Sequence, residues 1–303
     1  MSGQRHAVTG AFGYSGRQIA KRLLSQGHEV VTLTSKPPQP DVFERPIVTC
    51  PLCFDDPEQL ARSLEGVRVL YNTYWVRFNH KNFTHVDGIR NSGILFEAAK
   101  RAGVERIVHV SIANPSECSP FEYYRGKAVI EKKLQEVAVP HSILRPTVLF
   151  GYGDILMNNI AWTLRHFPVV GYFGKGNYRI RPIHLDDFAD LIVEHGTRIG
   201  NEIVDAVGPE DYPYKKLLRT VADVIGSKNF LVPVPKWVGY SVAKLVGRAQ
   251  RDTFLTWQEI GALCANLLTS DAAATGKISL RDYLGENRET IGRVYANELQ
   301  RRS

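Results

Sequence analysis

The stretch Ala7-Val-Thr-Gly10-Ala-Phe-Gly13-Tyr-Ser-Gly16-Arg-Gln-Ile-Ala20 decides the fold predicted for this chain. It joins a short apolar run, a turn with glycine at every third position and the start of a helix. Gly10 allows a sharp turn out of the strand, Gly13 lets backbone approach a phosphate, and Gly16 lets the helix pack close to the sheet. The positive end of that helix favours an anion. The stretch therefore predicts a cradle for the pyrophosphate of a dinucleotide.

Strand-like and helix-like segments alternate over the first half of the chain. The helix-like segments carry apolar residues at three- and four-residue spacing, and the strand-like segments are short apolar runs. This alternation predicts an α/β fold, a doubly wound parallel Rossmann sheet followed by a smaller, mostly helical C-terminal lobe. We expect strands at 7–9, 29–34, 46–50, 67–71, 106–111 and 141–144, and helices at 15–26, 57–64, 85–102 and 121–137.

The length of 303 residues accommodates one large core and a smaller appended lobe. We expect residues 1–150 to form the dinucleotide-binding Rossmann domain, with 178–207 returning to it. The remaining segments, 151–177 and 208–303, are expected to form the substrate-binding lobe.

The charge and hydropathy of the chain limit the partners and the cellular location that we expect for it. The net charge of +7 is spread along the sequence, which fits an anionic cofactor or substrate as well as a membrane surface or nucleic acid. We expect a small-molecule substrate and no nucleic acid partner. No apolar run reaches the length of a transmembrane segment, and the first strand begins too early for a signal peptide, so we expect a cytoplasmic monomer or homodimer. Residues 235–248 place apolar and basic residues at helical spacing, which fits a helix covering the cleft or one in peripheral contact with a membrane.

Two of the four cysteines, Cys50 and Cys53, have the spacing of a redox pair or of half a zinc site. A zinc site needs further ligands at matching spacing, and Cys118 and Cys264 are isolated in the sequence. A thioredoxin-like pair would begin a helix after the first strand. We therefore expect reduced cysteines at a strand end and no metal site.

The end of the second predicted strand bears on which dinucleotide binds. An acidic residue there accepts hydrogen bonds from the adenosine ribose, whereas a basic or small residue accommodates a 2′-phosphate. This chain has Thr34, Ser35 and Lys36 at that point, and Arg17 directly follows the third glycine. These residues favour NADP as the cofactor, with NAD as the alternative.

The sequence resembles the short-chain dehydrogenase/reductase superfamily in three motifs: Val8-Thr-Gly-Ala-Phe-Gly-Tyr-Ser-Gly16, Gly103-Val-Glu-Arg-Ile-Val-His-Val-Ser111 and Tyr123-Tyr-Arg-Gly-Lys127. The resemblance is closer to the extended or atypical branch, which includes the NAD-dependent epimerase/dehydratase family, NmrA-like proteins and a nucleotide-binding accessory subunit of respiratory complex I. Leu144-Arg-Pro-Thr-Val-Leu-Phe-Gly151 and Arg181-Pro-Ile-His-Leu-Asp-Asp-Phe-Ala189 extend the resemblance.

Tyr123 and Lys127 are four residues apart, so on a helix they share a face. A cation beside a phenol favours the phenolate. Lowering the pKa of a tyrosine from its usual value to near neutral pH is a change of about three pKa units, which corresponds to roughly 4 kcal/mol. The resemblance implies that Ser111 holds the substrate oxygen, that Tyr123 transfers its proton, and that Lys127 binds the nicotinamide ribose and tunes the tyrosine. Tyr124 is also within helical reach of Lys127, which leaves a register shifted by one residue open.

The resemblance also implies a set of residues along the cofactor. Asn91 resembles an asparagine that braces neighbouring backbone near the active site. Residues after the third, fourth and sixth strands are expected to pass the adenine, the pyrophosphate and the nicotinamide. The expected cofactor contacts are Gly10, Phe12, Gly13, Tyr14, Ser15, Gly16, Arg17, Ser35, Lys36, Cys53, Phe54, Asn72, Thr73, Tyr74, Lys127, Pro146, Thr147 and Val148.

Two functions of different classes follow. The first is an NAD(P)-dependent oxidoreductase, or an epimerase or dehydratase of this type, that transfers hydride between a nicotinamide cofactor and a small carbonyl or hydroxyl substrate. The second is a non-catalytic NADP(H)-binding sensor or assembly protein. The intact set of Ser111, Tyr123 and Lys127 favours the first, because a protein that only binds the nucleotide has no need of it.

Overall fold

The computed structural model describes residues 3–35, 39, 42–79 and 83–300. It divides into two compact units, of which unit 1 comprises Met1–Pro146 with Phe188–Asp205 and unit 2 comprises Thr147–Asp187 with Ala206–Ser303. These bounds differ from the expected division, which assigned 147–150, 178–187 and 206–207 to the Rossmann domain. The first two segments lie in unit 2 because their strands pair with each other or with other strands of that unit.

Unit 1 contains a seven-stranded sheet in the order β11-β6-β5-β4-β1-β2-β3. The strands from β1 to β6 are joined by parallel pairings. The order reverses between β1 and β4, and ligands of open α/β sheets bind outside the carboxyl ends of strands at such a reversal. The strands are β1 (Arg5–Thr9), β2 (Glu29–Thr34), β3 (Val48–Pro51), β4 (Val69–Asn72), β5 (Arg106–Val110), β6 (His141–Pro146) and β11 (Glu202–Ala206).

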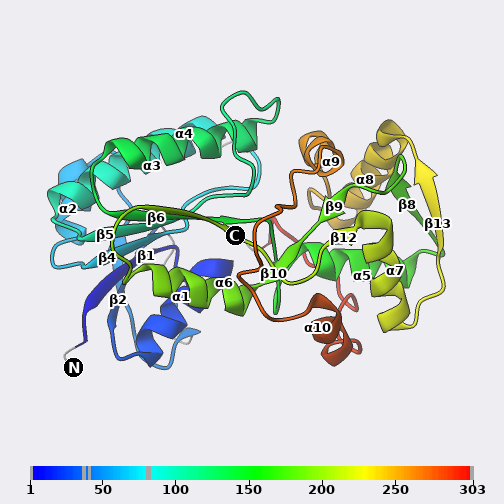
Figure 1. The fold of residues 1–303 in the computed structure, drawn as a ribbon, viewed down its shortest axis with the longest axis horizontal. Coiled ribbons are helices and arrows are strands. Elements are labelled where there is room, and N and C mark those ends of the chain that lie inside the picture. The colour runs from blue at the N-terminus through cyan, green and yellow to red at the C-terminus, as the bar shows by residue number, and fades with distance from the viewer. Residues whose placement is uncertain (1–2, 36–38, 40–41, 80–82, 301–303) are drawn as a thin grey trace. The chain divides into compact units, whose positions relative to one another are not determined.

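Helices cover both faces of this sheet, as Figure 1 shows: α2, α3 and α4 on one face, α1 and α6 on the other. The predicted doubly wound α/β fold is therefore confirmed, and the predicted strands and helices of the first half agree with the structure to within two residues at each end. The helices are α1 (Tyr14–Ser25), α2 (Pro57–Ser63), α3 (His85–Arg101), α4 (Glu122–Glu136) and α6 (Leu185–His195).

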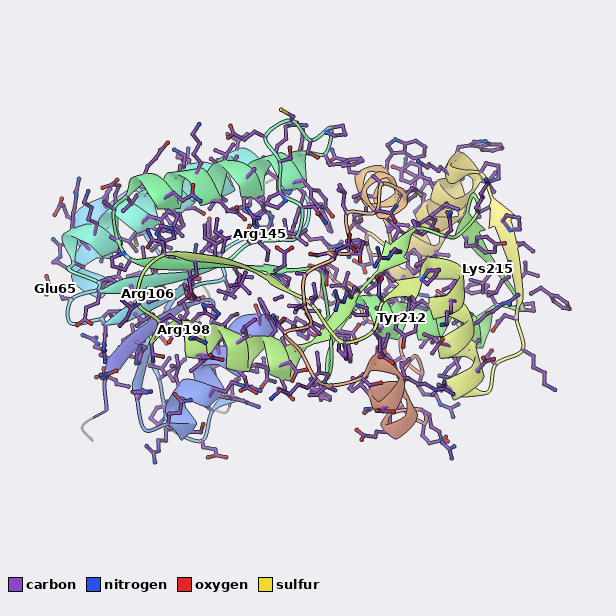
Figure 2. The ribbon with its side chains drawn as sticks, viewed as in Figure 1. Glu65, Arg106, Arg145, Arg198, Tyr212 and Lys215 are labelled. Carbon is purple, nitrogen blue, oxygen red and sulfur yellow. The ribbon has the colours of Figure 1, made fainter. Side chains whose placement is uncertain are left out.

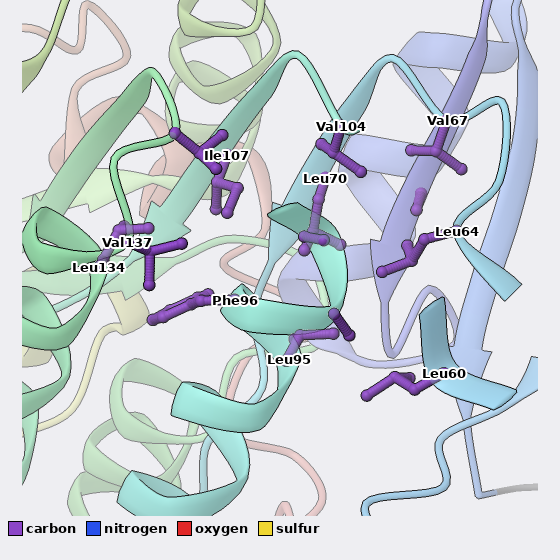
Figure 3. Close-up of a cluster of buried hydrophobic side chains, with 14 of the residues drawn as sticks. Leu60, Leu64, Val67, Leu70, Leu95, Phe96, Val104, Ile107, Leu134 and Val137 are labelled. Atoms are coloured by element: carbon purple, nitrogen blue, oxygen red, sulfur yellow. The ribbon is translucent and has the colours of Figure 1, made fainter. Parts of the chain in front are cut away.

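The core of unit 1 lies between the sheet and the helices α2, α3 and α4 (Figure 3). Leu70 of β4 and Ile107 of β5 are fully buried there, together with Leu95 and Phe96 of α3 and Leu134 of α4. Complete burial of such a side chain contributes roughly 1.5–3 kcal/mol. This packing fixes α3 and α4, and hence the side chains that α4 carries, against the carboxyl ends of the central strands.

Unit 2 is mainly helical, with short two-stranded ladders. None of the described helices of the chain combines the length and the apolar character needed to cross a bilayer. The helices of unit 2 are α5 (Leu156–His166), α7 (Tyr214–Ile225), α8 (Lys236–Gln250), α9 (Trp257–Cys264) and α10 (Leu280–Glu286). Its strand pairs are β7 (Val148–Phe150) with β10 (Pro182–His184), β8 (Val169–Phe173) with β13 (Phe230–Val234), and β9 (Arg179–Ile180) with β12 (Tyr212–Pro213).

Candidate functional site

The turn between β1 and α1 has the conformation that its glycines allow. Gly10 has a φ of +63°, the left-handed region that favours glycine. The Gly13 N–H donates to the Gly10 carbonyl at 2.8 Å, which closes the turn. A Cβ on Gly16 would lie 2.9 Å from the carbonyl carbon of Gly10 and collide with its oxygen. The close approach of α1 to the turn therefore requires glycine at position 16.

The N-terminus of α1 fits a phosphate group. Gly13 is its N-cap, no described side chain caps it, and its first turn has no acidic residue, so the helix itself supplies no anion there. A helix N-terminus in this setting favours a phosphate through its N–H groups and its dipole. Phe12 is buried and packs on Phe43 with ring centroids 6.0 Å apart, which anchors the turn, while Tyr14 and Ser15 are partly buried.

Arg17 supplies a cation beside this turn. Its Nη2 donates to the carbonyl of Phe12 at 3.2 Å, and its Nε is buried with no hydrogen-bond partner among the described residues. Ser35, just beyond β2, is exposed and provides a hydroxyl where an acid would select NAD. Lys36, the other predicted contact for a 2′-phosphate, lies outside the described residues.

Polar side chains tie the carboxyl ends of β1 and β4 together. Asn72 is fully buried, and its Oδ1 accepts hydrogen bonds from Thr9 Oγ1 at 3.1 Å and from the Tyr74 N–H at 3.0 Å. Its Nδ2 lies 3.0 Å from Nδ1 of the buried His109. Thr73 donates to Thr9 through both its N–H and its Oγ1, at 2.7 and 2.6 Å. The Asn72 side chain thus braces the strand ends from inside, and its predicted contact with a cofactor stays a prediction.

Tyr74 lies among aromatic side chains on the loop after β4. Its ring centroid is 5.0 Å from that of Phe54 and 5.4 Å from that of Phe83. Its hydroxyl accepts a hydrogen bond from Asn91 Nδ2 at 2.9 Å, and burial raises the pKa of Tyr74 to about 12. Asn91 therefore braces a side chain, where backbone was expected. Cys53, next to Phe54, is a partly buried free thiol.

Lys127 of α4 is buried, with 2% of its surface exposed. Its Nζ donates to the carbonyl of Val110 at 2.8 Å and lies 5.0 Å from the centre of the Trp75 ring. Burial lowers the pKa of Lys127 to about 7, and Glu131 acts in the opposite direction. An ammonium has three donors, so this arrangement leaves donors for the hydroxyls of a ribose.

Tyr123, one helical turn before Lys127, belongs to an aromatic cluster. Its ring lies edge-on to Trp75 at 5.8 Å and to His85 at 5.7 Å. Trp75 and His85 are themselves stacked, with ring centroids 5.1 Å apart, and burial lowers the pKa of His85. Tyr124 is 4% exposed, whereas Tyr123 is only partly buried. Solvent therefore reaches Tyr123 more than Tyr124.

Glu131 holds the Ser111 hydroxyl. Ser111 directly follows β5, is 4% exposed, and its Oγ donates to Glu131 Oε1. Arg145 donates to the same carboxylate from Nε at 3.0 Å and from Nη2 at 2.5 Å, and it lies between α4 and the sheet (Figure 2). Because the serine proton is directed to Glu131, the Ser111 oxygen faces other groups as an acceptor.

The last predicted cofactor contacts lie on both sides of the boundary between the units. Pro146 ends β6, and its carbonyl accepts a hydrogen bond from the Ala113 N–H at 2.9 Å. Thr147 is 6% exposed, and its Oγ1 donates to the carbonyl of Arg181 in unit 2. Val148 packs in the hydrophobic core of unit 2. The Thr147 and Val148 side chains thus have structural contacts within unit 2, and their predicted contact with the cofactor stays a prediction.

Three residues of the site were absent from the predicted set of contacts. Trp75 lies between α3 and α4, where a Cβ on Gly88 or Gly126 would come within 2.6 or 2.8 Å of its ring. Glu131 and Arg145 form an ion pair in which the carboxylate is buried and the guanidinium is partly exposed. The sequence does hold a signal for the pair, because Arg145 interrupts an apolar strand and Glu131 lies one turn beyond Lys127.

Comparison with known proteins relates this chain to proteins that bind NAD(P)H. The sequence model of an NAD(P)H-binding family matches residues 10–153. The chain is 25% identical over 301 residues to subunit 9 of the NADH dehydrogenase [ubiquinone] 1 alpha subcomplex of Rattus norvegicus, a mitochondrial protein, covering 93% of this chain and 76% of the relative. It is 26% identical over 238 residues to the ceramide reductase of Caulobacter vibrioides, covering 76% and 73%.

A solved structure shares the fold. The Citrobacter sp. triphenylmethane reductase complexed with NADP(H) superposes with a TM-score of 0.75 at 15% identity, covering 93% of this chain and 99% of that one. The glycine turn, the uncapped helix and the parallel sheet agree with these similarities. Residues 10–153 of this chain therefore match an NAD(P)H-binding domain, and the chain shares the fold of this reductase.

Proposed function

We propose that this protein is an NAD(P)H-dependent oxidoreductase that acts on a small carbonyl or hydroxyl substrate and prefers NADPH. Tyr123 is the proton donor in the direction of reduction. Lys127 holds the ribose of the nicotinamide and stabilises the phenolate of Tyr123. Arg17 and Ser35 receive the 2′-phosphate. The reductases among the similar proteins support this class of reaction.

The observation that carries the proposal is the burial of Lys127. A buried ammonium is costly unless an anion or several hydrogen bonds compensate it. Here its described contacts are one carbonyl oxygen and the face of Trp75, while Glu131 is already engaged by Arg145 and Ser111. A perturbed cation at the carboxyl edge of a parallel sheet is typical of a functional site.

The residues divide the reaction as follows. When bound, the nicotinamide supplies or accepts the hydride. Tyr123 gives its proton to the substrate oxygen, and the positive charge of Lys127 lowers the cost of the phenolate that remains. Ser111 accepts a hydrogen bond from Tyr123 or from the product hydroxyl, because its own proton is directed to Glu131. Stacking on His85 holds Trp75 as one wall of this space.

The substitution Tyr123→Phe tests the proposal. Removal of the proton donor should lower kcat by about two to four orders of magnitude. The dissociation constant of NADPH should stay nearly unchanged, since the hydroxyl is assigned to the substrate. NADPH oxidation is followed with a panel of aldehydes, ketones, enones and quinones. Tyr124→Phe is the matched control and should keep its activity, and full activity in Tyr123→Phe would show the assignment to be wrong.

A second candidate function is an NADP(H)-binding protein without turnover that supports an assembly. The Ser111 hydroxyl favours it, because a serine that donates to a buried Glu131 does not donate to a substrate carbonyl. Similarity to a subunit of a mitochondrial NADH dehydrogenase also favours it. Tight binding of NADPH with no oxidation across the substrate panel, together with a co-purifying protein, would establish this candidate over the first.

A further inference from the structure

Helix α8 packs into unit 2 through small residues. Ala243 and Gly247 are its buried residues, and a Cβ on Gly239 would come within 3.2 Å of the Cζ atom of Phe173. The three positions are four residues apart and so lie on one face of the helix. In Figure 1, α8 lies beside β8, which contains Phe173. Tyr240 packs against a hydrophobic cluster of unit 2, and small residues form the rest of the inner face of α8.

Three other large apolar side chains of α8 are exposed. The exposed fraction is 68% for Trp237, 55% for Val242 and 67% for Leu245. A surface helix of a globular protein usually points such residues to the core. The neighbouring α9 adds Trp257, which is 50% exposed and lies 5.5 Å from the Tyr240 ring. The outer face of α8, defined here by Trp237, Val242, Lys244, Leu245 and Arg248, is therefore apolar as well as basic.

The charge of this segment has one sign. Residues 224–251 contain no aspartate or glutamate and carry the cations Lys228, Lys236, Lys244, Arg248 and Arg251. The Lys244 Nζ lies 5.0 Å over the Tyr240 ring, so its methylene stem runs along the helix. Lysine and arginine in such positions keep the charge at a polar boundary while their stems cover apolar surface.

We propose that the outer face of α8 binds the surface of a lipid bilayer with anionic headgroups. The helix lies in the interface, with Trp237, Val242 and Leu245 at the acyl boundary and the basic side chains among the headgroups. Charge complementarity selects an anionic surface. The alternation of exposed apolar and basic residues along one helix favours a bilayer over a protein partner, which would need a shaped surface of about 800 Å². This proposal is independent of the reaction proposed above.

Flotation of the full chain with vesicles tests it. The protein should float with phosphatidylcholine vesicles that contain phosphatidylserine, and high salt should release it. Lys244→Glu/Arg248→Glu should lower the partition coefficient by at least about 25-fold, since one basic residue near an anionic surface contributes about fivefold. Leu245→Ser should lower it by about tenfold through lost apolar burial. Brominated acyl chains should quench tryptophan fluorescence in the wild type and much less in Trp237→Phe.

Two exposed positions elsewhere in unit 2 provide matched controls. Val294 is 77% exposed and Lys216 is exposed on α7. Val294→Ser and Lys216→Glu should bind within about twofold of the wild type, because neither lies on α8. All variants change exposed side chains, and their melting temperatures verify folding. Absence of flotation, equal flotation with pure phosphatidylcholine, or equal losses in the controls would overturn the proposal, and a protein partner would then be the occupant to seek.

Discussion

Lys127 holds an ammonium group against one carbonyl oxygen and the face of a tryptophan. The unfolded chain hydrates the same group fully, so folding carries a cost while the group is charged. The cost is visible as a lowered pKa, which places the titration of this side chain near neutral pH. The buried ammonium of Lys127 therefore lowers the stability of the folded chain, at a position where it can bind a ribose and stabilise a phenolate.

The stability of Lys127→Met should show this cost. The pKa of Lys127 is about 7 in the folded chain and 10.5 as its ordinary value, so between these values the unfolded chain binds more protons and stability rises with pH. Below pH 7 the full cost applies. Since one pKa unit is about 1.4 kcal/mol, the methionine variant should gain at most about 5 kcal/mol below pH 7 and nothing above pH 10.5.

Urea unfolding at several pH values measures this difference. Lys132→Met, on an exposed part of the same helix, is the control and should change stability by less than about 0.5 kcal/mol at every pH. A Lys127→Met variant that is less stable than the wild type at neutral pH would show that its hydrogen bond to Val110 outweighs the cost of burial. Loss of turnover together with a gain in stability would link the cost to function.

Helix α4 is the element that gathers the chemistry. Tyr123, Lys127 and Glu131 are four residues apart, so one face of the helix carries the phenol, the ammonium and the carboxylate in order. Packing of Leu134 in the core holds this face toward the sheet. The start of helix α1 is assigned to the phosphates, and its close approach to the turn depends on glycine at position 16.

Gly16→Ala tests the role of α1. The added methyl group would collide with the carbonyl of Gly10, so the helix start must shift away from the turn. We expect the dissociation constant of NADPH to rise at least tenfold, with a loss of about 1–3 kcal/mol in stability from overpacking. Fluorescence titration and urea unfolding measure the two effects.

Gly285→Ala is the matched control for that substitution. Gly285 lies in α10, and no atom of the described residues lies within 4 Å of the position that its methyl group would take, so alanine should be neutral or stabilising by about 0.5–1 kcal/mol. Binding of NADPH by Gly16→Ala at wild-type strength would argue against contact between the start of α1 and the pyrophosphate.

At the scale of the whole molecule, the chain leaves unit 1 at Pro146 and returns at Phe188. The returning segment adds β11 to the edge of the sheet beside β6. Arg106 links the two passes of the chain, since its guanidinium donates to the carbonyls of His195 and Gly200 at 2.7 and 2.8 Å (Figure 2). The net charge of +7 attracts anionic ligands to the molecule as a whole.

Binding of the nucleotide should therefore stabilise the folded chain. A ligand at 100 times its dissociation constant adds about 2.7 kcal/mol, so NADPH should raise the melting temperature by several degrees. NADH should do so less. Arg17→Ala should reduce the shift with NADPH and leave the shift with NADH unchanged, since the guanidinium is assigned to the 2′-phosphate. Equal shifts with both nucleotides in the wild type would contradict the preference for NADPH.

The sequence alone determined the local parts of this protein. The glycine spacing predicts the turn before α1 because backbone conformation and close approach depend on the residues themselves. Short apolar runs alternate with segments that carry apolar residues at helical spacing. This alternation predicts the parallel sheet, because each segment's preference also depends on its own residues. Both agree with the structure, and the start of the nucleotide site follows from them.

Only the tertiary structure decided which polar side chains meet. Asn72 turns inward to Thr9 and His109, the Ser111 proton goes to Glu131, and Val148 packs in unit 2. Each of these contacts joins residues far apart in the chain, and strand order and helix packing bring them together. A pattern of residue types indicates that a hydroxyl or an amide stands at a strand end, but the direction of its hydrogen bond depends on the neighbour that folding places beside it.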